Sequence, residues 1–462
     1  MKRLLLWVVA LMATLTIQAQ DYSSYYQNLP VEMPTPVLAE IPELTVLLTD
    51  FGAVGDGLTL NTDAFNKAIA SLSKQGGGHL VVPAGIWLTG PIALKDNIDL
   101  HLEKNAIIMA TPDRALHLKG EKTTTLISAS KRKNISITGE GTIDGNGAMW
   151  RPVKRGKVSD TEWKEFLSMG GTVTDDGSLW YPYDLKHFDN LAGSPKEQEK
   201  QRTHLIRFTD CQRVYVAGVT LQNAPKFHLI PTRCQEVIID GVTVKCPWNA
   251  QNGDAIDLSS CRNALVVNCI VDAGDDGICM KAGAGESGVK YGPCENILIE
   301  NNTVYHAHGG FVIGSEFSGG MRNIVVRNNR FSGTDTGLRF KSGVGRGGVC
   351  ENIYISDIVM TDIKGEAIVF ECGYVNRSAG ENVEEQKAAA DAPFAPQFTD
   401  IHISNVVCRG ARTAIQAEGI EGLRCIWDVT VENSTFFYNH TERKIENAEI
   451  ELKDCRFVTF DK

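Results

Sequence analysis

Carboxylates, a histidine and two cations recur at equivalent places in the second half of this chain. Six short stretches can be written under one another, and in each of them apolar side chains alternate with other residues. This alternation is typical of a strand with one buried face. The stretches are DAIDLS from Asp254, DGICMK from Asp276, GGFVIG from Gly309, TGLRFK from Thr336, EAIVFE from Glu366 and TAIQAE from Thr413.

The acidic residues of this alignment fall close together if the repeats stack. Asp254 and Asp276 occupy the same position in adjacent repeats, and stacked strands lie ~4.8 Å apart. Two carboxylates at that separation repel one another and share a proton or hold a water. Asp275 precedes Asp276 between two glycines, which permit the turn that brings both side chains into one groove, and the equivalent of Asp275 one repeat later is His308.

Such a cluster has the groups that cleavage of an acetal needs. One acid must protonate the departing oxygen and, for inversion, one base must deprotonate an attacking water. Mutual repulsion separates the pKa values of clustered carboxylates, so a single cluster can supply both groups. Arg339 and Lys341 stand two residues apart on one face of the next repeat, where they could hold a substrate carboxylate. Each feature alone is more often structural, but their in-register positions in successive repeats favour a functional site.

The composition indicates a soluble protein without generic affinity for nucleic acid. The 462 residues carry a formal net charge of −10, which argues against nucleic acid as a partner. An anionic substrate must therefore be attracted by a local basic patch.

The first residues have the layout of a secretory signal peptide. Lys2 and Arg3 precede an apolar run from Leu4 to Ile17, so we assign residues 1–20 to this peptide. The run is too short to span a bilayer comfortably. We expect export to a periplasm or beyond, without membrane insertion after cleavage, and an extended, proline-containing lead-in over residues 21–47.

The remainder, residues 48–462, is predicted to be a single all-β solenoid. A strand-like unit returns from about residue 95 onward, and the units from Arg213 to Asn352 lie 23 to 33 residues apart. Short strands at such a period, without long helices between them, predict a parallel β-helix. An amphipathic run from Asn61 to Ser73 predicts a short helix that caps its N-terminal end. Residues 151–202 form an insertion.

The cysteines do not predict a disulfide framework or a metal site. A chain of this length does not need disulfides for stability, and no CxxC or histidine-rich spacing occurs. We expect neither a metal nor another cofactor. Five cysteines stand three residues before an apolar strand residue, which predicts stacked buried thiols: Cys211, Cys234, Cys261, Cys294 and Cys350.

Four short motifs resemble the polygalacturonase family, family 28 of the glycoside hydrolases. They are, in order, Asn252-Gly253-Asp254, Gly274-Asp275-Asp276, Ala307-His308-Gly309 and Arg339-Phe340-Lys341. The stretch HGGFVIGSEFSGGMRNI from His308 resembles the bacterial branch, and FGAVGDG from Phe51 resembles its N-terminal cap. The likeness covers residues 48–460. It implies a right-handed, pectin-lyase-like parallel β-helix and an inverting hydrolase of α-galacturonosidic bonds in pectin.

The resemblance also implies roles for individual residues. Asp275 would be the general acid, and Asp254 and Asp276 would position and activate water. His308 would tune the acid. The groups implied or suggested for substrate binding are Arg339, Lys341, Asn252, Lys281 and Arg202.

Departures from the family motifs leave the substrate open. Gly253 replaces a threonine and Ala307 a glycine, both beside the catalytic set, and Thr203 replaces the usual proline after Arg202. We expect a monomer that acts on a pectic oligo- or polysaccharide. The insertion could block one end of the groove, which favours exo-action.

Three alternatives remain at this point. The same machinery could act on rhamnogalacturonan or another branched pectin. A Ca²⁺-dependent pectate lyase shares the β-helix, and the acidic cluster could be mistaken for its calcium site. A non-catalytic carbohydrate-binding β-helix would carry no hydrolytic activity.

Overall fold

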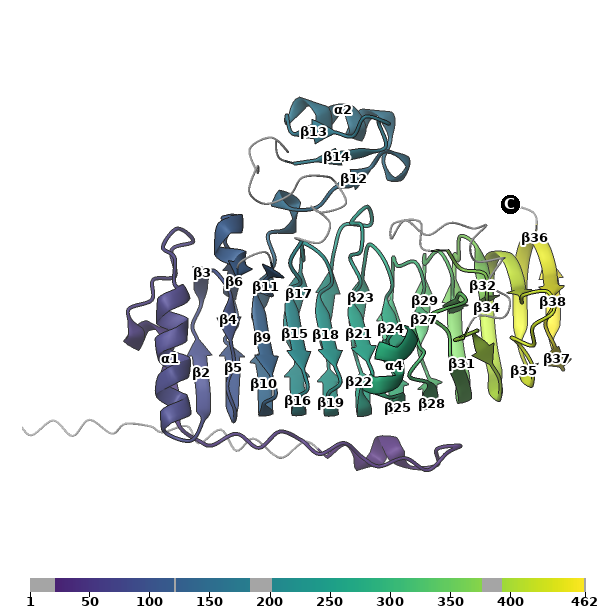
Figure 1. Ribbon diagram of the computed structural model, residues 1–462, viewed down its shortest axis with the longest axis horizontal. Coiled ribbons are helices and arrows are strands. Elements are labelled where there is room, and N and C mark those ends of the chain that lie inside the picture. Colours follow the sequence, from purple (N-terminus) through teal and green to yellow (C-terminus); the bar gives the residue numbers. More distant parts are fainter. Residues whose placement is uncertain (1–20, 120–121, 183–201, 376–392, 461–462) are drawn as a thin grey trace, which may run out of the picture.

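The protein is a long parallel β-helix, seen in a computed structural model that describes residues 21–119, 122–182, 202–375 and 393–460 (Figure 1). One 33-stranded sheet joins the strands of successive coils as parallel neighbours. This confirms the predicted all-β solenoid. The predicted signal peptide lies outside the described residues, and no helix within them is long and apolar enough to cross a membrane.

One face of the solenoid, called the site sheet below, carries the aligned stretches of the sequence. Its strands follow one another along the axis in chain order. They are β4 (Ile92–Ala93), β9 (Ile127–Ser130), β15 (Ile206–Thr209), β18 (Leu229–Thr232), β21 (Ile256–Ser259), β24 (Ile278–Lys281), β27 (Phe311–Ser315), β30 (Leu338–Ser342) and β32 (Glu366–Glu371).

The second face carries the recurring units with asparagine at the corner. Its strands are β1 (Thr45–Leu47), β2 (Gly78–Val82), β5 (Ile98–Leu102), β10 (Lys133–Gly139), β16 (Gln212–Ala217), β19 (Gln235–Asp240), β22 (Arg262–Val267), β25 (Cys294–Glu300), β28 (Met321–Arg327), β31 (Val349–Thr361), β34 (Ile401–Glu418), β35 (Val429–Glu432) and β37 (Ile450–Lys453).

Short strands form the third face and lead into the turns that carry the acidic residues. They are β3 (Gly85–Thr89), β6 (Ala106–Ala110), β11 (Thr142–Asp144), β17 (Thr220–Gln222), β20 (Thr243–Lys245), β23 (Ile270–Asp272), β26 (Thr303–Val304) and β29 (Arg330–Ser332). Near the C-terminal end, β31 and β34 continue from the second face onto this one, and β33 (Gln397–Phe398), β36 (Thr435–Glu446) and β38 (Arg456–Thr459) complete the coils.

The corners of the coils explain the recurring asparagines. Asn263, Asn296, Asn323 and Asn352 all have φ between 54 and 58°, a left-handed conformation that asparagine tolerates better than most residues. Their side chains also form a ladder: Asn296 donates to Asn263 at 3.0 Å and Asn323 donates to Asn296 at 2.9 Å. The ladder satisfies polar groups at each corner and keeps successive coils in register.

The interior is filled by stacked apolar side chains from the alternating positions. Ile256, Ile278, Phe311, Leu338 and Ile368 are each at most 1% exposed. Because the same position of each coil faces inward, the core is continuous along the axis. This packing holds the outward side chains of the site sheet in fixed columns.

The N-terminal end of this core is closed by α1 (Thr62–Lys74). Its buried face is the one that the helical spacing predicts, and the helix follows Asn61 directly. The predicted cap is therefore confirmed. The residues on its buried face are Ala64, Phe65, Ala68, Ile69 and Leu72.

The lead-in before β1 lies against the outer surface of the second face and runs along the lower side of the solenoid (Figure 1). Tyr22 is 3% exposed and packs in one cluster with Leu265, Leu298 and Val325. Its hydroxyl donates to Asp240 Oδ2 at 2.9 Å. The segment thus covers apolar side chains on a sheet face that would otherwise meet water.

The described part of the insertion is a small unit that rises from one side of the solenoid (Figure 1). It contains α2 (Asp160–Ser168) and an antiparallel sheet of β12 (Val153–Lys154), β14 (Leu179–Tyr181) and β13 (Thr172–Val173). Val153, Val158 and Trp180 form its own buried cluster. Arg151 joins it to the solenoid, donating to Ala224 O and to Asn223 Oδ1 at 2.8 Å each.

The cysteines are free, and all but Cys455 are buried. Cys211, Cys234 and Cys261 lie level in successive coils, as the predicted stack of thiols requires. They contribute apolar volume to the core.

Candidate active site

The residues between the buried positions of the aligned stretches form columns on the site sheet. Asp257, Cys279, Val312, Arg339 and Val369 lie level in consecutive strands. The same register places Asp254 beside Asp276 in the turns that precede β21 and β24, where Ala255 N donates to Asp276 O.

Asp275 and His308 meet in the turns before β24 and β27. His308 N donates to Asp275 O at 2.8 Å, and the side chains meet with 2.9 Å between Nδ1 and Oδ1. Asn252 N donates to Asp275 Oδ2 at 3.2 Å. Burial raises the pKa of Asp275, but the opposing effects of His308, Lys341 and Lys157 outweigh it, so this pKa lies well below the usual range in the unliganded site.

Asp276 is held as a carboxylate by a buried lysine. Lys341 Nζ donates to Asp276 Oδ1 at 3.1 Å and to Oδ2 at 2.8 Å, and the Arg339 guanidinium lies 3.8 Å from Oδ1. Burial and the neighbouring Asp275 raise the pKa of Asp276, but the combined effect of Lys341, Arg339 and Lys281 outweighs them, so the pKa lies below its usual value. Asp276 is therefore suited to accept a proton.

The pKa of Asp254, in contrast, is raised. Asp254 is 3% exposed, its Oδ2 lies 3.3 Å from Lys281 Nζ, and its Oδ1 has no hydrogen-bond partner among the described residues. Burial and the nearby Asp257 raise its pKa well above the usual range. The cluster thus contains carboxyl groups of unequal protonation, which acid and base catalysis at one centre requires.

Asp257 is a member of this cluster that the motif analysis did not select as a site residue. It is 1% exposed, and Lys281 Nζ donates to its Oδ2 at 2.6 Å. Burial raises the pKa of Asp257 to about 6 despite this lysine. Its place in the outward column of the sequence alignment was the available signal, because a carboxylate there must face the groove.

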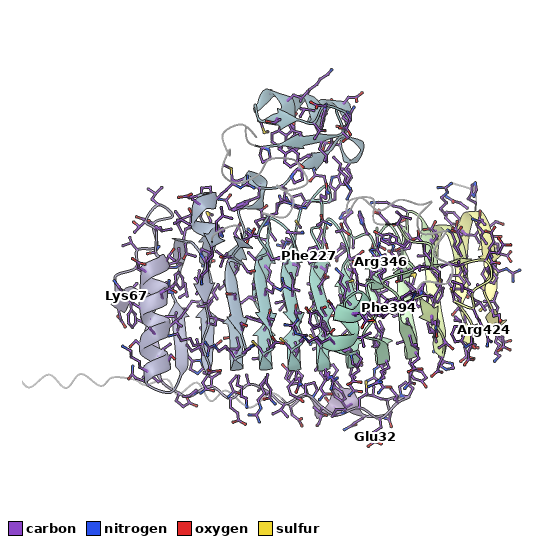
Figure 2. The ribbon with its side chains drawn as sticks, viewed as in Figure 1. Glu32, Lys67, Phe227, Arg346, Phe394 and Arg424 are labelled. Atoms are coloured by element: carbon purple, nitrogen blue, oxygen red, sulfur yellow. The ribbon has the colours of Figure 1, made fainter. Side chains whose placement is uncertain are left out.

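Aromatic rings adjoin the basic residues on both sides of the cluster. The Tyr374 ring lies 5.9 Å from Arg339, 5.3 Å from Lys341 and 6.0 Å from Arg346. On the other side, Lys281 Nζ lies 4.5 Å from the centre of the Phe227 ring. Phe227 and Arg346 lie toward the side of the solenoid from which the insertion rises, whereas Lys67 marks the N-terminal end (Figure 2).

Two of the residues expected to contact substrate, Arg202 and Lys281, contact other groups of the protein. Arg202 is 2% exposed and donates to Gln251 O at 2.7 Å and to Asn252 Oδ1 at 2.8 Å. It holds the loop whose Asn252 N contacts Asp275. Lys281 Nζ already forms ion pairs with the carboxylates of Asp254 and Asp257.

Two further charged residues contact His308. Lys157 of the insertion lies with its Nζ 3.0 Å from His308 Nε2, and Asp335 Oδ2 lies 3.8 Å from the same nitrogen. Asp335 occupies the turn position of His308 one coil later, so alignment of the turns would have found it. Lys157 has no repeat position, and no sequence signal indicated its contact.

Asp275, Asp276 and His308 could be taken for a metal site, because one donor atom from each lies within 4.8 Å of the others. Two ammonium groups already contact this set: Lys341 at Asp276 and Lys157 at His308. A divalent cation would be repelled by both. The donor set therefore fits proton chemistry better than metal binding.

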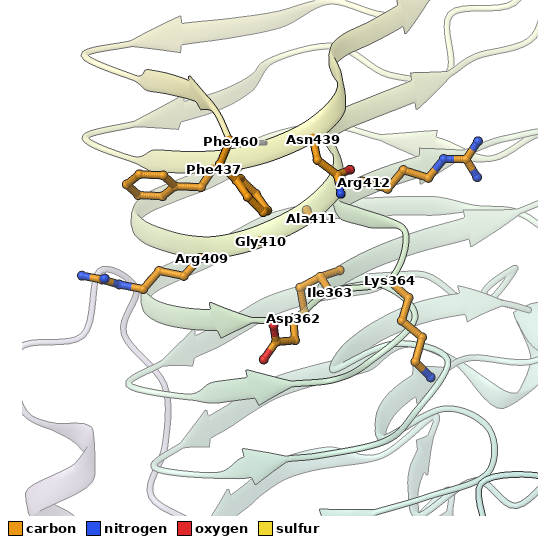
Figure 3. A pocket seen from close by; sticks show the side chains of 10 residues that line it. All are labelled: Asp362, Ile363, Lys364, Arg409, Gly410, Ala411, Arg412, Phe437, Asn439 and Phe460. Carbon is orange, nitrogen blue, oxygen red and sulfur yellow. The ribbon is translucent and has the colours of Figure 1, made fainter. Parts of the chain in front are cut away.

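A cavity of about 370 Å³ lies further toward the C-terminal end, on the same side as the acidic turns. Its rim includes Lys364, Arg409 and Arg412, and the two guanidinium groups point to opposite sides (Figure 3). Lys364 connects the cavity to the cluster, since its Nζ lies 3.2 Å from Asp335 Oδ1.

Known proteins resemble this chain in fold and in sequence. The sequence pattern of glycosyl hydrolases family 28 matches residues 157–455. A probable polygalacturonase of Vitis vinifera is 30% identical over 409 residues, covering 83% of this chain and 73% of that protein. An exo-poly-alpha-D-galacturonosidase of Dickeya chrysanthemi is 28% identical over 413 residues, covering 85% and 67%.

A solved structure agrees with these relatives. The hyperthermoactive exopolygalacturonase of Thermotoga maritima superposes with a TM-score of 0.71 at 30% identity, covering 90% of this chain and 94% of that one. Together with the four motifs in register on a parallel β-helix, these matches show that this chain belongs to family 28 of the glycoside hydrolases, the polygalacturonase family.

Proposed function

We propose that this polygalacturonase-like hydrolase cleaves α-galacturonosidic bonds of pectin by inversion and acts from a chain end. The observation that carries the proposal is the meeting of Asp254, Asp275 and Asp276 beside Arg339 and Lys341. The carboxyl groups provide the acid and base, and the cations favour a sugar that carries a carboxylate.

Asp275 is the proposed general acid because it is the carboxyl group that a substrate oxygen can reach. Its side chain is 16% exposed, against 4% for Asp254 and 3% for Asp276. Geometry takes precedence over the unliganded pKa here. A galacturonate carboxylate bound beside Arg339 would offset nearby positive charge and so raise the pKa of Asp275, which allows it to hold the proton that the departing oxygen needs.

Asp276 is the proposed base, with Asp254 assisting in holding the water. Lys341 keeps Asp276 ionised, whereas the raised pKa of Asp254 favours its protonated form, which can donate to the water. Separation alone does not argue for inversion, because oxygens of Asp275 and Asp276 approach within 4.8 Å, closer than is general for inverting enzymes. Inversion is what the family resemblance implies.

Exo-action is supported by the reach of the insertion. Lys157 brings this unit into contact with His308, so the insertion closes part of the groove beside the catalytic cluster. A long polymer could then enter from one side only. The relatives from Dickeya chrysanthemi and Thermotoga maritima are themselves described as exo-acting.

The substrate would extend toward the C-terminal coils. The turns of His308, Asp335, Lys364 and Arg412 follow one another, so the basic rim of the cavity continues the line of the cluster. Within the described residues, neither Arg409 nor Arg412 has an ion-pair partner. Both are available to an acidic chain although the protein as a whole is acidic.

Incubation with defined pectic fractions tests this proposal. Monogalacturonate released from the outset indicates exo-action, whereas a ladder of sizes indicates endo-action. Proton NMR of the first product should show the β-anomer for inversion, and the α-anomer would contradict it. Cleavage of rhamnogalacturonan but not of polygalacturonate would favour the branched-pectin alternative, and an unsaturated product that absorbs in the ultraviolet would favour a lyase.

A further inference from the structure

Lys157, in the described part of the insertion, contacts the catalytic cluster. Its Nζ donates to Gly274 O at 3.1 Å and lies 3.0 Å from His308 Nε2. Gly274 directly precedes Asp275, so this one ammonium contacts both the turn that carries the acid and the imidazole that contacts the acid. The two contacts span 117 and 151 residues of sequence.

Ordered structure on both sides holds Lys157 in this place. It ends a short 3₁₀ turn, Arg155–Lys157, that lies between β12 and the buried Val158. Arg155 donates to Val158 O at 2.9 Å. Directly afterwards, Ser159 caps α2 and exchanges hydrogen bonds with Glu162. A lysine on such a support presents its ammonium in a defined direction rather than as a mobile surface charge.

The contact with the Lys157 ammonium determines which nitrogen of His308 carries a proton. A charged lysine only donates, so Nε2 must be an acceptor without hydrogen. Nδ1 then carries the proton and donates a hydrogen bond to Asp275 Oδ1, 2.9 Å away. Without the lysine, Nε2 would face only the Asp335 carboxylate at 3.8 Å, an acceptor that favours a proton on Nε2 instead.

The surrounding charges agree with this arrangement. His308 is faced by Asp275 on one side and by Asp335 and Lys157 on the other, and Asp335 is itself paired with Lys364 at 3.2 Å. Burial lowers the pKa of Lys157 more than the nearby Asp275 raises it. Lys157 thus places its ammonium between the turn of the proposed acid and the imidazole that contacts this acid.

We propose that Lys157 is a positioning residue that fixes His308 as the neutral, Nδ1-protonated imidazole and thereby orients Asp275. The active centre of this chain is then complete only with its insertion seated. The kinetic consequence rests on the proposed hydrolase function, but the state of His308 can be measured without any substrate.

The test compares Lys157→Met, which keeps the length but loses the donor, with Lys157→Arg, which keeps the donor. Lys164→Met is the matched control, because it removes an exposed charge from the same insertion. In the parent protein, ¹⁵N NMR of labelled histidine should show Nδ1 protonated and Nε2 unprotonated for the signal that disappears in His308→Gln. In Lys157→Met this signal should change to that of an imidazole protonated on Nε2 or to a mixture of tautomers.

The kinetic arm measures kcat and KM separately. Lys157→Met should lower kcat roughly 10- to 100-fold with little change in KM, since an imprecisely held acid loses part of its contribution. Lys157→Arg should recover part of the loss, and Lys164→Met should behave as the parent. A parent His308 protonated on Nε2, or an unchanged tautomer in a folded Lys157→Met, would overturn the proposal. If no pectic fraction is cleaved by the parent, the hydrolase proposal fails while the NMR result still decides the role of Lys157.

Discussion

Lys341 donates to both carboxylate oxygens of Asp276, and both side chains are almost fully buried. Arg339 approaches the same carboxylate only to 3.8 Å and is more exposed, at 18% against 7% for the side chain of Lys341. The two cations of the Arg-Phe-Lys motif therefore differ in role. Lys341 maintains the charge of Asp276, and Arg339 is the better placed to receive a substrate carboxylate.

Replacing Lys341 by methionine should abolish most activity and shift its pH dependence. Lys341 lowers the pKa of Asp276 against the effect of burial, so its removal raises this pKa and protonates the proposed base. The acidic limb of the kcat/KM profile should move to higher pH, with a loss of 100-fold or more at the optimum, on the order of a lost general base. Loss of the cation that pairs with the buried Asp276 should also cost about 3 kcal/mol of stability.

The control for this variant is Lys444→Met, an exposed lysine near the C-terminus, which should leave the pH profile unchanged. A Lys341→Met enzyme that folds and keeps the parent profile would contradict the assigned link between Lys341 and Asp276. Unfolding in denaturant, followed in parallel, separates lost activity from lost structure.

Asp257 makes stability depend on pH in an unusual direction. Its folded pKa is about 6, above the unfolded value, so the folded protein binds more protons between about pH 4 and 6. Stability contributed by this group is present at low pH and is lost as pH rises through that window, by at most about 3 kcal/mol. In Asp257→Asn the free energy of unfolding should fall less steeply with pH over the window.

For this variant the informative quantity is the slope of the free energy of unfolding against pH. Its absolute value is less informative, because loss of a partner for Lys281 changes the free energy of unfolding at every pH. Glu421→Gln, at an exposed position, provides the reference slope. Identical slopes for Asp257→Asn and the parent would show that Asp257 titrates normally in the folded protein.

The lead-in should contribute to stability but not to catalysis. Tyr22→Ala removes a buried ring and the hydrogen bond to Asp240, which should lower the free energy of unfolding by about 3 kcal/mol. Because the segment covers the second face, kcat/KM at temperatures below unfolding should not change. Glu32→Ala is the control in the same segment, and equal stability of the two variants would show that the lead-in is not bound in solution.

The sequence predicted the features that repeat but not the contacts made by segments that occur once. Alternation in DAIDLS and DGICMK gave the register of β21 and β24, because a buried face leaves only one consistent pairing. The meeting of Asp275 with His308 followed from that register. Asparagine at the corners marked the coils because its left-handed conformation recurs there.

Contacts made by non-repeating segments had no such basis. Lys157 reaches His308 from an insertion whose placement depends on Arg151 and on its own small core. Tyr22 is positioned by packing against the outer surface of the second face. No pattern in the sequence of the lead-in predicts this contact. The buried state of Arg202 likewise depends on the loop at Asn252, a long-range contact with no local signature.

The basic rim of the cavity should matter for long substrates only. Arg409→Gln combined with Arg412→Gln should raise KM for long oligogalacturonates roughly tenfold, since two exposed ion pairs contribute about 1 kcal/mol or less each. Short oligomers should be hydrolysed as by the parent, and the difference should shrink at high salt. Lys67→Gln with Lys74→Gln on α1 removes the same charge far from the cavity and should have no effect. Equal losses for short and long substrates would remove the cavity from the binding path.

Hydrolysis of polygalacturonate by Asp275→Asn tests the central claim most directly. Asparagine keeps the size of the side chain but cannot protonate a departing oxygen, so the account predicts a fall in kcat of several orders of magnitude while oligogalacturonate binding persists. A folded Asp275→Asn enzyme that hydrolyses its best substrate at near the parent rate would contradict it.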